Sequence, residues 1–320
     1  MLVLNCKVVI TGERKWEITT VKNIRIERNI DTLVDWCEIE IPSKTRWDSE
    51  RKCPFKYGDI IKVYLGYGEE TELAFDGSIL RISQINSLKL TCGDRGASTA
   101  YLKLPQTGTI IINDFKNYIL EITGEKEVIN DESIKINKIQ IFDTSVGALL
   151  SKLYSDYNIR SGFVLRESKP MFYVGRIKNE DIKAVYDVER NVIKNEMYKY
   201  REVAQGYDLE CISINRKNEQ IKESGYFGIP PYKKVTYKYY NLTTKELKDE
   251  YNRLLKEFYW RNYAGTITVF GGRLVEKYDL IGIKKNGEKI GIYEVEKNVI
   301  TFGTTGYRQK IWIGNEKRQG

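Results

Sequence analysis

The side chains that most often carry out chemistry in enzymes are unevenly represented in this sequence. Histidine is absent from all 320 residues. Catalytic triads, cysteine–histidine pairs, histidine-bound zinc ions and histidine pH switches therefore have no histidine to use. Acidic residues number 44, so a carboxylate pair needs a geometric reason to be singled out. We predict a protein that is not an enzyme.

One carboxylate pair has a spacing that would suit the cleavage of glycans. Glu294 and Glu296 lie two residues apart in a strand-like segment, so they share a face of that strand. Two carboxylates about 5–10 Å apart in a cleft can hydrolyse a glycosidic bond. The same alternation is typical of any solvent-facing strand, and we favour that interpretation. Asp31, Asp35 and Asp48 lie in turn-like contexts without the spacing of a metal-binding loop.

The cysteines and glycines show no pattern typical of metal or phosphate binding. The number of cysteines is odd and none are spaced as Cys-x-x-Cys, which argues against a zinc site. We interpret them as buried, inert thiols in a reducing compartment; they are Cys6, Cys37, Cys53, Cys92 and Cys211. The segment Gly66-Tyr67-Gly68 lacks the third glycine and the following helix of a dinucleotide site. We expect no catalytic residue, no cofactor and no metal.

Charge and hydropathy argue against binding to nucleic acid or to a membrane. The net charge is +8, but basic clusters such as Lys233-Lys234 and Lys284-Lys285 are short. Nucleic-acid binding calls for a denser basic stripe. No stretch approaches the ~20 apolar residues of a membrane helix. The apolar start, residues 1–10, is interrupted by Lys7 and lacks the features of a signal peptide. We expect no specific nucleic acid, no membrane insertion and a protein made in the cytosol.

The elements that would position these residues are mainly short β strands. Residues 37–41 alternate apolar and acidic side chains before Pro42, the pattern of a half-buried antiparallel strand, and residues 60–67 alternate similarly. Asn286-Gly287 lies between two apolar runs and predicts a tight hairpin. Residues 303–306 predict a second turn near the C-terminus. Strands this short and at this spacing favour a small barrel or sandwich.

One helix is predicted in the middle of the chain, over residues 145–157. Its apolar residues recur at positions that share one helical face; they are Val146, Leu149, Leu150, Leu153 and Tyr157. Asp143, Thr144 or Ser145 is placed to cap the first turn. We expect this helix to belong to a small α/β insertion.

A second helix is predicted near residues 243–262. Thr243 and Glu246 have the spacing of a capping box, in which each side chain bonds the backbone amide of the other residue. The predicted buried stripe consists of Leu247, Tyr251, Leu254, Leu255, Phe258 and Tyr259. We expect Gly265 to end the helix.

The predicted domain organisation follows the change from a β pattern to a mixed pattern and back. At roughly 100–200 residues per domain, the chain should hold two or three domains. We expect a first β-barrel domain over 1–104, an α/β insertion domain over 105–170 and a second β-barrel domain over 171–320, with the helix near 243–262 packed on it. The predicted fold class is mainly β with an α+β insertion, as two small β-barrel domains joined by an α/β region.

Two stretches, one toward each end of the chain, resemble the same protein family. The first contains a strand led by Tyr57-Gly58-Asp59 and another that contains Phe75 and Gly77; its parts are residues 31–42, 56–67 and 73–79. The second begins with the helix near 243–262 and continues through residues 265–271, 278–281, 293–297 and 301–311. In order and spacing they resemble the phage tail baseplate hub proteins, which include late control protein D and the head of the VgrG spike.

The resemblance implies a structural role in an assembly. In such hubs, two barrels of each subunit lie side by side, so that three subunits present six similar barrels to a six-fold tail tube and a three-fold face to a spike. The expected partners are two further copies of the chain, a tail tube protein and a separate spike protein, because the chain stops at Gly320 without the C-terminal domain and needle of VgrG. The expected location is a virion tail or phage-tail-like particle assembled in the cytoplasm of the bacterial host.

Aromatic residues leave a second functional class open. The chain has 23 Tyr, 10 Phe and 5 Trp, and aromatic rings stack on sugars as readily as they fill protein interfaces. A receptor- or carbohydrate-binding tail component would use exposed rings such as Trp47, Trp260 or Trp312. We favour their packing in cores or between subunits. A glycan-cleaving tail enzyme, built on the carboxylate pair described above, is the third hypothesis. The sequence does not single out the residues of the subunit interface.

Overall fold

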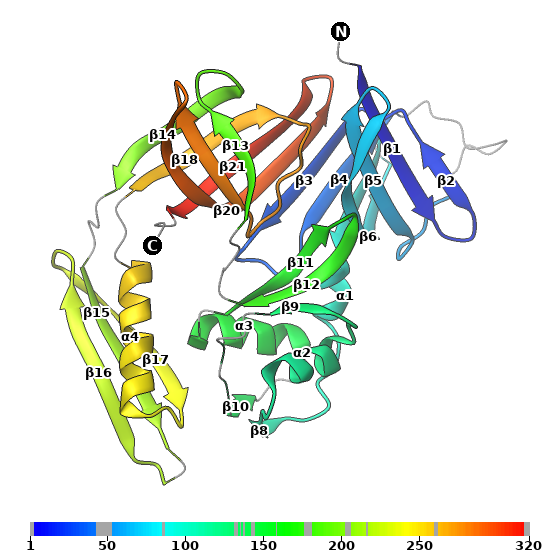
Figure 1. Cartoon of the computed structure of the whole chain (residues 1–320). Helices are drawn as coiled ribbons and strands as arrows, with labels where there is room; N and C mark the ends of the chain where they lie inside the picture. Colours follow the sequence, from blue (N-terminus) through cyan, green and yellow to red (C-terminus); the bar gives the residue numbers. More distant parts are fainter. Residues whose placement is uncertain are drawn as a thin grey trace.

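The computed structural model describes most of the chain and confirms a mainly β fold. The described residues are 3–42, 53–84, 87–130, 134, 136, 138–141, 145–157, 159–175, 181–201, 206–215, 217–258 and 262–316. Within them lie 21 strands and four helices. Figure 1 shows a large curved sheet, an α/β insertion beneath it and a smaller lobe beside the insertion.

The N-terminal part of the large sheet, which we call the N-terminal β unit, is formed by seven strands. They are β1 (Leu4–Thr11), β2 (Lys15–Ile18), β3 (Asn23–Asn29), β4 (Trp36–Ile41), β5 (Ile60–Tyr67), β6 (Glu70–Ser83) and β7 (Leu88–Asp94). Their order in the sheet is β3-β4-β7-β6-β5-β1-β2 and every pairing is antiparallel.

The predicted alternation places one face of these strands in a common core. In β4, Cys37, Ile39 and Ile41 are buried, whereas Glu38 and Glu40 are half-buried. The buried residues of β5 follow the same period and include Ile61, Val63 and Leu65. Burying each such side chain stabilises the fold by roughly 1.5–3 kcal/mol. Both strand predictions are confirmed.

The C-terminal part of the sheet, the C-terminal β unit, has six strands. They are β13 (Ile182–Asp187), β14 (Val192–Arg201), β18 (Asn262–Phe270), β19 (Leu280–Lys285), β20 (Glu288–Gly303) and β21 (Gly306–Glu316). The strand order is β14-β18-β21-β20, with β19 also paired to β20 and β13 paired to β19. A second hydrophobic core lies inside this unit and contains Tyr293, Val295, Ile311 and Ile313.

The two β units are joined through β20. Its first half pairs with β19, and its second half pairs with β3, from Lys297 opposite Asn29 to Gly303 opposite Asn23. As a result the strands of the two units form one 13-stranded sheet, and their hydrogen-bonded ladders follow an open path. Phe302 and Tyr307 even pack into the core of the N-terminal β unit. Where the sequence predicted two barrels side by side, the structure has two β units joined along a shared seam, and the closure of each unit into a barrel stays a prediction.

Both turns predicted in the C-terminal β unit are confirmed. Asn286 and Gly287 connect β19 to β20 with φ of 51° and 84°. Two consecutive positive φ angles match the twist of a tight hairpin, which is why Asn-Gly is favoured there. Residues 304–305 connect β20 to β21, flanked by Gly303 and Gly306.

The insertion lies below the seam in Figure 1 and mixes helices with short strands. Its elements are α1 (Arg95–Thr99), β8 (Gly108–Ile111), α2 (Phe115–Thr123), β9 (Val128–Asn130), β10 (Lys138–Ile141), α3 (Val146–Tyr157), β11 (Arg160–Arg166) and β12 (Lys169–Gly175). Strands β8 and β10 form one sheet, and β11-β12-β9 form another. The predicted boundary at residue 171 falls inside β12, whose neighbours both belong to the insertion.

Helix α3 confirms the prediction for residues 145–157. All five residues of the predicted apolar face are buried. The hydroxyl of Ser145 accepts a hydrogen bond from the Ala148 amide at 3.3 Å, as expected of a capping residue. The other two candidate caps, Asp143 and Thr144, lie outside the described residues.

The small lobe consists of three strands and one helix. They are β15 (Gly206–Ile214), β16 (Gln220–Phe227), β17 (Tyr232–Tyr240) and α4 (Thr244–Phe258), with strand order β16-β15-β17. The amide of Thr243 donates to Glu246 at 2.9 Å and the amide of Glu246 donates to Thr243 at 3.3 Å, which confirms the capping box. Leu247 and Leu254 of the predicted stripe are buried. They face β15 and β16, so α4 covers the small lobe's own sheet.

The predicted end of this helix was wrong. The described part of α4 stops at Phe258, and β18 has already begun at Asn262, so Gly265 is a strand residue. Its φ is +147°, and a Cβ atom there would lie 2.1 Å from the carbonyl oxygen of Glu196 on β14. Close contact between strands, and not a helix cap, explains this glycine. The side chain of Phe258 and all of Tyr259 lie outside the described residues.

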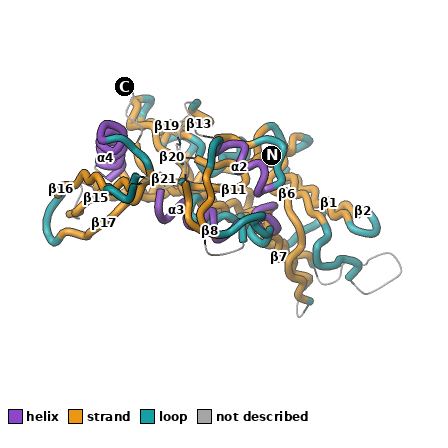
Figure 2. Tube along the Cα trace, turned by 90° about the horizontal axis from the view of Figure 1, so that it is seen from below, coloured by secondary structure: helices purple, strands orange, loops and turns teal. Residues whose placement is uncertain are grey.

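The molecule is elongated. Figure 2 shows the small lobe at one end and the β1–β2 hairpin at the other, with the insertion between them. Among the described helices, none combines the length and apolar character needed to cross a membrane.

Candidate functional site

The chain segment between β18 and β19 passes through the point where the three larger parts of the molecule meet. Four consecutive polar residues in it, Glu276 to Asp279, expose no more than 4% of their surface. Burying a charge is costly unless it is paired and hydrogen-bonded. We call this segment and its partners the ionic junction. Two of the four residues contact the N-terminal β unit, and the other two contact the insertion.

Two of the residues reach the N-terminal β unit. The Glu276 carboxylate lies 2.9 Å from the guanidinium of Arg28 on β3. Arg28 also donates to the carbonyl of Ala74 on β6. The Lys277 ammonium lies 2.7 Å from the carboxylate of Asp35, in the loop between β3 and β4. These two ion pairs attach the segment to the β3–β4 corner.

The other two residues reach the insertion. The Asp279 carboxylate lies 2.9 Å from the guanidinium of Arg166 on β11. The ring of Tyr278 stacks on Tyr173 of β12, with 4.3 Å between ring centroids. Tyr278 has a φ of +70°, a left-handed conformation that is strained for a bulky residue. The surrounding contacts hold it there, since its hydroxyl also lies 3.4 Å from the carbonyl oxygen of Ser161 on β11.

The start of the segment is held by the C-terminal β unit itself. The side-chain amide of Asn298 donates a hydrogen bond to the carbonyl oxygen of Val275 at 2.6 Å. Gln309 donates to the carbonyl of Arg273 at 2.9 Å and accepts from the Val275 amide at 3.1 Å. Asn298 and Gln309 are fully buried on β20 and β21. The segment is therefore bonded on all sides by the three parts that it connects.

Burial changes the acidity of the carboxyl groups at the junction. It raises the pKa of Glu276 to about 7, although the Arg28 guanidinium acts in the opposite direction. It also raises the pKa of Asp35, opposed by the Lys277 ammonium. The pKa of Asp94 lies well above its usual range because of burial and the negative charge of Asp35. The junction therefore keeps protons on its acids to a higher pH than solvated carboxyls do.

The arrangement supports a structural role. Asp94 caps helix α1 by accepting a hydrogen bond from the Gly96 amide at 3.0 Å, and the other carboxylates of the junction face cations. Within the described residues, no group of three or more His, Cys, Asp or Glu side chains is arranged to hold a metal ion. The geometry fixes the relative positions of the two β units and the insertion.

The carboxylates considered from sequence lie elsewhere or serve this junction. Glu294 and Glu296 lie on β20, half-buried, on either side of the buried Val295. Asp31 is exposed and accepts a hydrogen bond from the hydroxyl of Tyr154 at 3.1 Å. Asp35, interpreted from sequence as a turn residue, is an ion-pair partner. Asp48 lies outside the described residues.

The cysteines occupy buried or partly buried positions, and one of the tryptophans considered from sequence, Trp312, is half-buried between lysines. Cys6, Cys37, Cys92 and Cys211 are buried free thiols and Cys53 is partly buried. Burial raises the pKa of Cys92 and of Cys211 to about 12, which disfavours the reactive thiolate. Trp312 is half-buried, and the ammonium groups of Lys297 and Lys310 lie 5.3 and 5.2 Å from its ring centroid. Trp47 and Trp260 lie outside the described residues.

Sequence reasoning missed the junction residues. Glu276 to Asp279 form a short polar run after an apolar pair, which normally indicates an exposed turn. The sequence held one weak indication, because Tyr278 and Asp279 belong to the stretch that resembles the hub family. No pattern in the neighbouring residues, however, indicates that they contact Tyr173 and Arg166. The partners are too far away in sequence for any local pattern to reveal them.

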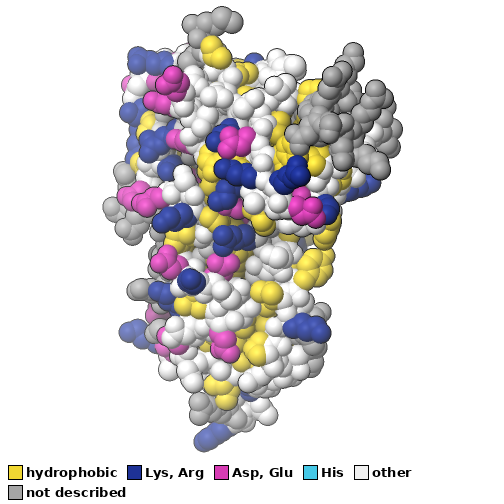
Figure 3. Space-filling view, turned by 90° about the vertical axis from the view of Figure 1, so that its right-hand side faces the viewer, with side chains coloured by type: hydrophobic (Ala, Val, Ile, Leu, Met, Phe, Trp, Pro, Cys, Tyr) yellow, Lys and Arg dark blue, Asp and Glu magenta, His cyan; other side chains and the backbone are white. Residues whose placement is uncertain are grey.

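Charge is mixed on the one face of the molecule that Figure 3 shows. On the face shown in Figure 3, Lys and Arg side chains are interspersed with Asp and Glu, and hydrophobic side chains are scattered between them. This distribution lacks the continuous basic stripe of a nucleic-acid site.

Comparison with solved structures identifies the fold. The chain resembles the 43 kDa tail protein of prophage MuSo2 from Shewanella oneidensis, with 13% identity, a TM-score of 0.64 and coverage of 97% of this chain and 98% of the other. It also resembles the tail protein of Neisseria meningitidis MC58, with 13% identity, a TM-score of 0.67 and coverage of 98% and 97%. The chain has the fold of phage tail proteins.

This tail-protein fold extends to a secretion system. The Escherichia coli protein c3393, a component of the type VI secretion system described as similar to the T4 tail proteins gp27 and gp5, matches with 9% identity and a TM-score of 0.54 over 98% of this chain and 79% of its own. No family model and no curated protein matches the sequence. The resemblance inferred from sequence is confirmed at the level of the fold.

Proposed function

We propose that the chain is a structural hub subunit of a phage tail or phage-tail-like particle. Three copies would form a ring that joins a hexameric tail tube to a trimeric spike carried by a separate protein, without enzymatic activity. The tail-protein fold, which covers nearly all of this chain and of its neighbours, supports a structural tail component. The ring, its partners and its location in the virion tail are parts of the proposal.

The observation that carries the proposal is the seam between the two β units. A ring of three subunits can imitate six-fold symmetry only if each subunit holds two similar units at a fixed angle. Pairing of β20 with β3 over seven residue pairs makes the two units parts of one sheet. We keep the predicted domains 1–104, 105–170 and 171–320 as a proposal, in which the first contains the N-terminal β unit and the third contains the C-terminal β unit and the small lobe, while α1 and β12 pack with the insertion.

The ionic junction supports the same proposal from a second direction. A seam between two strands leaves the units free to flex about it, because strand twist is variable. Ion pairs from Glu276 and Lys277 to the β3–β4 corner, and from Asp279 to β11, resist that motion. A rigid pair of β units is what a symmetry adaptor requires.

The ends of the large sheet offer surfaces for the neighbouring subunits. In the described part of the chain, β2 pairs only with β1, and β14 pairs only with β18. Unpaired strand edges invite pairing with another chain. A ring uses two different patches on each copy, and two edges at opposite ends of one sheet meet that requirement.

Mass measurement in solution tests the proposal. Light scattering on the purified chain, alone and with a candidate tail tube protein, should give three copies of the chain per complex. Electron microscopy of the mixture should place six similar β units against the tube. A chain that stays monomeric and fails to join tube particles at high concentration would contradict the hub assignment, while leaving the fold unaffected.

A further inference from the structure

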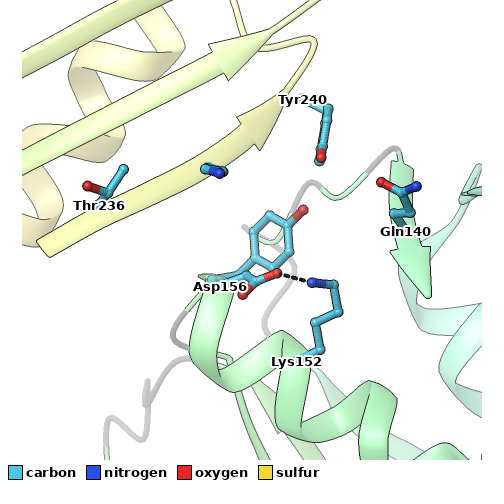
Figure 4. Close-up of a pocket in the computed structure, with 7 residues that line it drawn as sticks. Gln140, Lys152, Asp156, Thr236 and Tyr240 are labelled. Atoms are coloured by element: carbon cyan, nitrogen blue, oxygen red, sulfur yellow. Dashed lines mark ion pairs between the residues drawn. The ribbon is translucent and has the colours of Figure 1, made fainter. Parts of the chain in front are cut away.

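A cleft of about 350 Å³ separates the insertion from the small lobe. Figure 4 shows that its walls come from three elements that are distant in sequence. Lys152 and Asp156 rise from α3, and Gln140 faces them from β10. The opposite wall is β17, whose contributing residues are Thr236, Lys238 and Tyr240. Clefts at the boundary between two lobes are common binding sites.

The β17 wall presents alternate side chains of a strand. Thr236, Lys238 and Tyr240 share one face, because successive side chains point to opposite sides of a strand. Tyr239 points the other way, and its hydroxyl donates to Glu250 of α4 at 3.1 Å. Alternate residues on a strand are roughly 6–7 Å apart. The same spacing separates alternate side chains of an extended peptide lying along the wall.

The cleft contains more positive than negative charge. Lys152 and Asp156 neutralise each other, with 2.7 Å between ammonium and carboxylate. Lys238 has no ion-pair partner among the described residues. Lys138 does not line the cleft but lies beside it, with its ammonium 5.7 Å from the ring centroid of Tyr240, and it too has no ion-pair partner among the described residues. Two uncompensated cations beside one paired cation favour a ligand with more than one negative charge.

Polar groups in the cleft suit a peptide backbone. The hydroxyl of Thr236 donates to Glu210 at 3.1 Å, which leaves its oxygen able to accept an amide hydrogen. Gln140 offers both an amide donor and a carbonyl acceptor. The cations come from three elements, Lys152 from α3, Lys238 from β17 and Lys138 from β10. Charges distributed in and beside a cleft of about 350 Å³ fit several carboxylates along a chain better than a single phosphate.

We propose that this cleft binds an acidic, extended segment of a partner polypeptide in the assembled tail. That the partner belongs to the tail rests on the proposed function, whereas the preference of the cleft for an acidic peptide does not. Lys238 and Lys138 would pair with carboxylates of the segment, while Gln140 and Thr236 would bond its backbone. Charge-assisted contacts of this kind give specificity as well as affinity.

A capped hexaglutamate peptide tests the proposal on the full-length chain. Calorimetric titration at low salt should detect binding that weakens as salt is added. Lys238→Gln should weaken it about tenfold, the effect of one charge-assisted contact. Lys233→Gln is the matched control, since Lys233 lies on the same strand and does not line the cleft; it should change the affinity less than twofold.

A gain of affinity separates the proposal from simple damage to the fold. Asp156→Asn removes the carboxylate that neutralises Lys152 and should strengthen hexaglutamate binding about threefold, because it frees a third cation. Hydrogen exchange should show the peptide protecting residues 236–240. Equal weakening by Lys233→Gln and Lys238→Gln, no binding, or equally tight binding of inorganic phosphate or a thymidine oligonucleotide would each overturn the proposal.

The two proposals fail in different ways. If the chain forms no hub complex but binds hexaglutamate in the cleft, only the proposed function is wrong. If the hub complex forms and Lys238→Gln binds the peptide as well as the original chain does, only the cleft assignment is wrong.

Discussion

Two lysine–aspartate pairs in this molecule have the same distance between ammonium and carboxylate but different surroundings. Lys277 lies 2.7 Å from Asp35 in the ionic junction, with 0% and 5% of the two side chains exposed. Lys152 lies 2.7 Å from Asp156 in the cleft, with 38% and 34% exposed. Distance alone therefore says little about what an ion pair does. Its surroundings decide whether it holds parts of the fold together or remains available to a ligand.

The physical reason is the environment of the charges. In the junction, neither charge can return to water while the fold persists, so removal of one leaves the other uncompensated. In the cleft, water screens both charges and replaces either partner at little cost. The buried pair at the junction therefore contributes to stability, whereas the exposed pair in the cleft can be separated by a ligand at little cost.

Removing the buried lysine should have the largest effect. Lys277→Met keeps most of the side-chain volume and leaves Asp35 buried without its ammonium. We expect the free energy of unfolding to fall by about 3–5 kcal/mol. Urea denaturation monitored by circular dichroism would measure it. A loss below about 1 kcal/mol would mean that the junction pair behaves like an exposed one.

Glu276 should make the stability of the junction depend on pH. Its pKa is about 7 in the fold against 4.5 in a model compound, so between these values the folded chain binds more protons than the unfolded chain. Its contribution is therefore complete below about pH 4.5 and declines as pH rises to 7. The stability difference between the original chain and Glu276→Gln should shift by roughly 2–3 kcal/mol between pH 5 and pH 8.

Glu13→Gln is the control for this pH effect. Glu13 is exposed, and its hydrogen bond with Lys56 lowers its pKa, so its titration ends below the window that is measured. Denaturation of both variants at several pH values should show that the fall in the free energy of unfolding with rising pH becomes shallower in Glu276→Gln and stays unchanged in Glu13→Gln. An unchanged slope in Glu276→Gln would contradict the assignment to Glu276.

Replacing both members of the buried pair should restore much of the lost stability. Lys277→Met with Asp35→Leu exchanges two buried charges for apolar side chains, which is often close to neutral. We expect the free energy of unfolding of the double variant to lie within about 1–2 kcal/mol of that of the original chain. A double variant as unstable as Lys277→Met would show that the lysine acts through contacts other than its ion pair.

Removing the exposed lysine should have the smallest effect. Lys152→Met breaks an i,i+4 ion pair on α3 and should lower the free energy of unfolding by about 0.3–0.5 kcal/mol. The same denaturation assay gives a direct comparison with Lys277→Met. A loss as large as the one at Lys277 would remove the distinction between the two regions.

Local patterns predicted the elements well where a few neighbouring residues decide the outcome. The alternation in residues 37–41, the Asn286-Gly287 turn and the apolar face of residues 145–157 each depend on short-range geometry, and each was confirmed. The helix near 243–262 was correct at its capping box. Its end was misplaced because Gly265 serves a contact with β14, which no local pattern contains.

The candidate sites could not be predicted in the same way. Lys277 and Asp35 are 242 positions apart in the chain, and each alone is typical of a solvated turn. The cleft joins residues of α3, β10 and β17, which meet only when the small lobe lies against the insertion. Nothing in the spacing of these residues indicates that they share a site.

The sequence by itself determined the strands, the turns, the faces of two helices and the resemblance to a tail-protein family, because periodicity and turn chemistry act over a few residues. Only the tertiary structure decided that β20 joins the two β units, that four consecutive polar residues are buried at their junction, and that Lys152 and Lys238 line one cleft. The reason is physical: burial and pairing determine what a charge does, and both depend on residues brought together from distant parts of the chain.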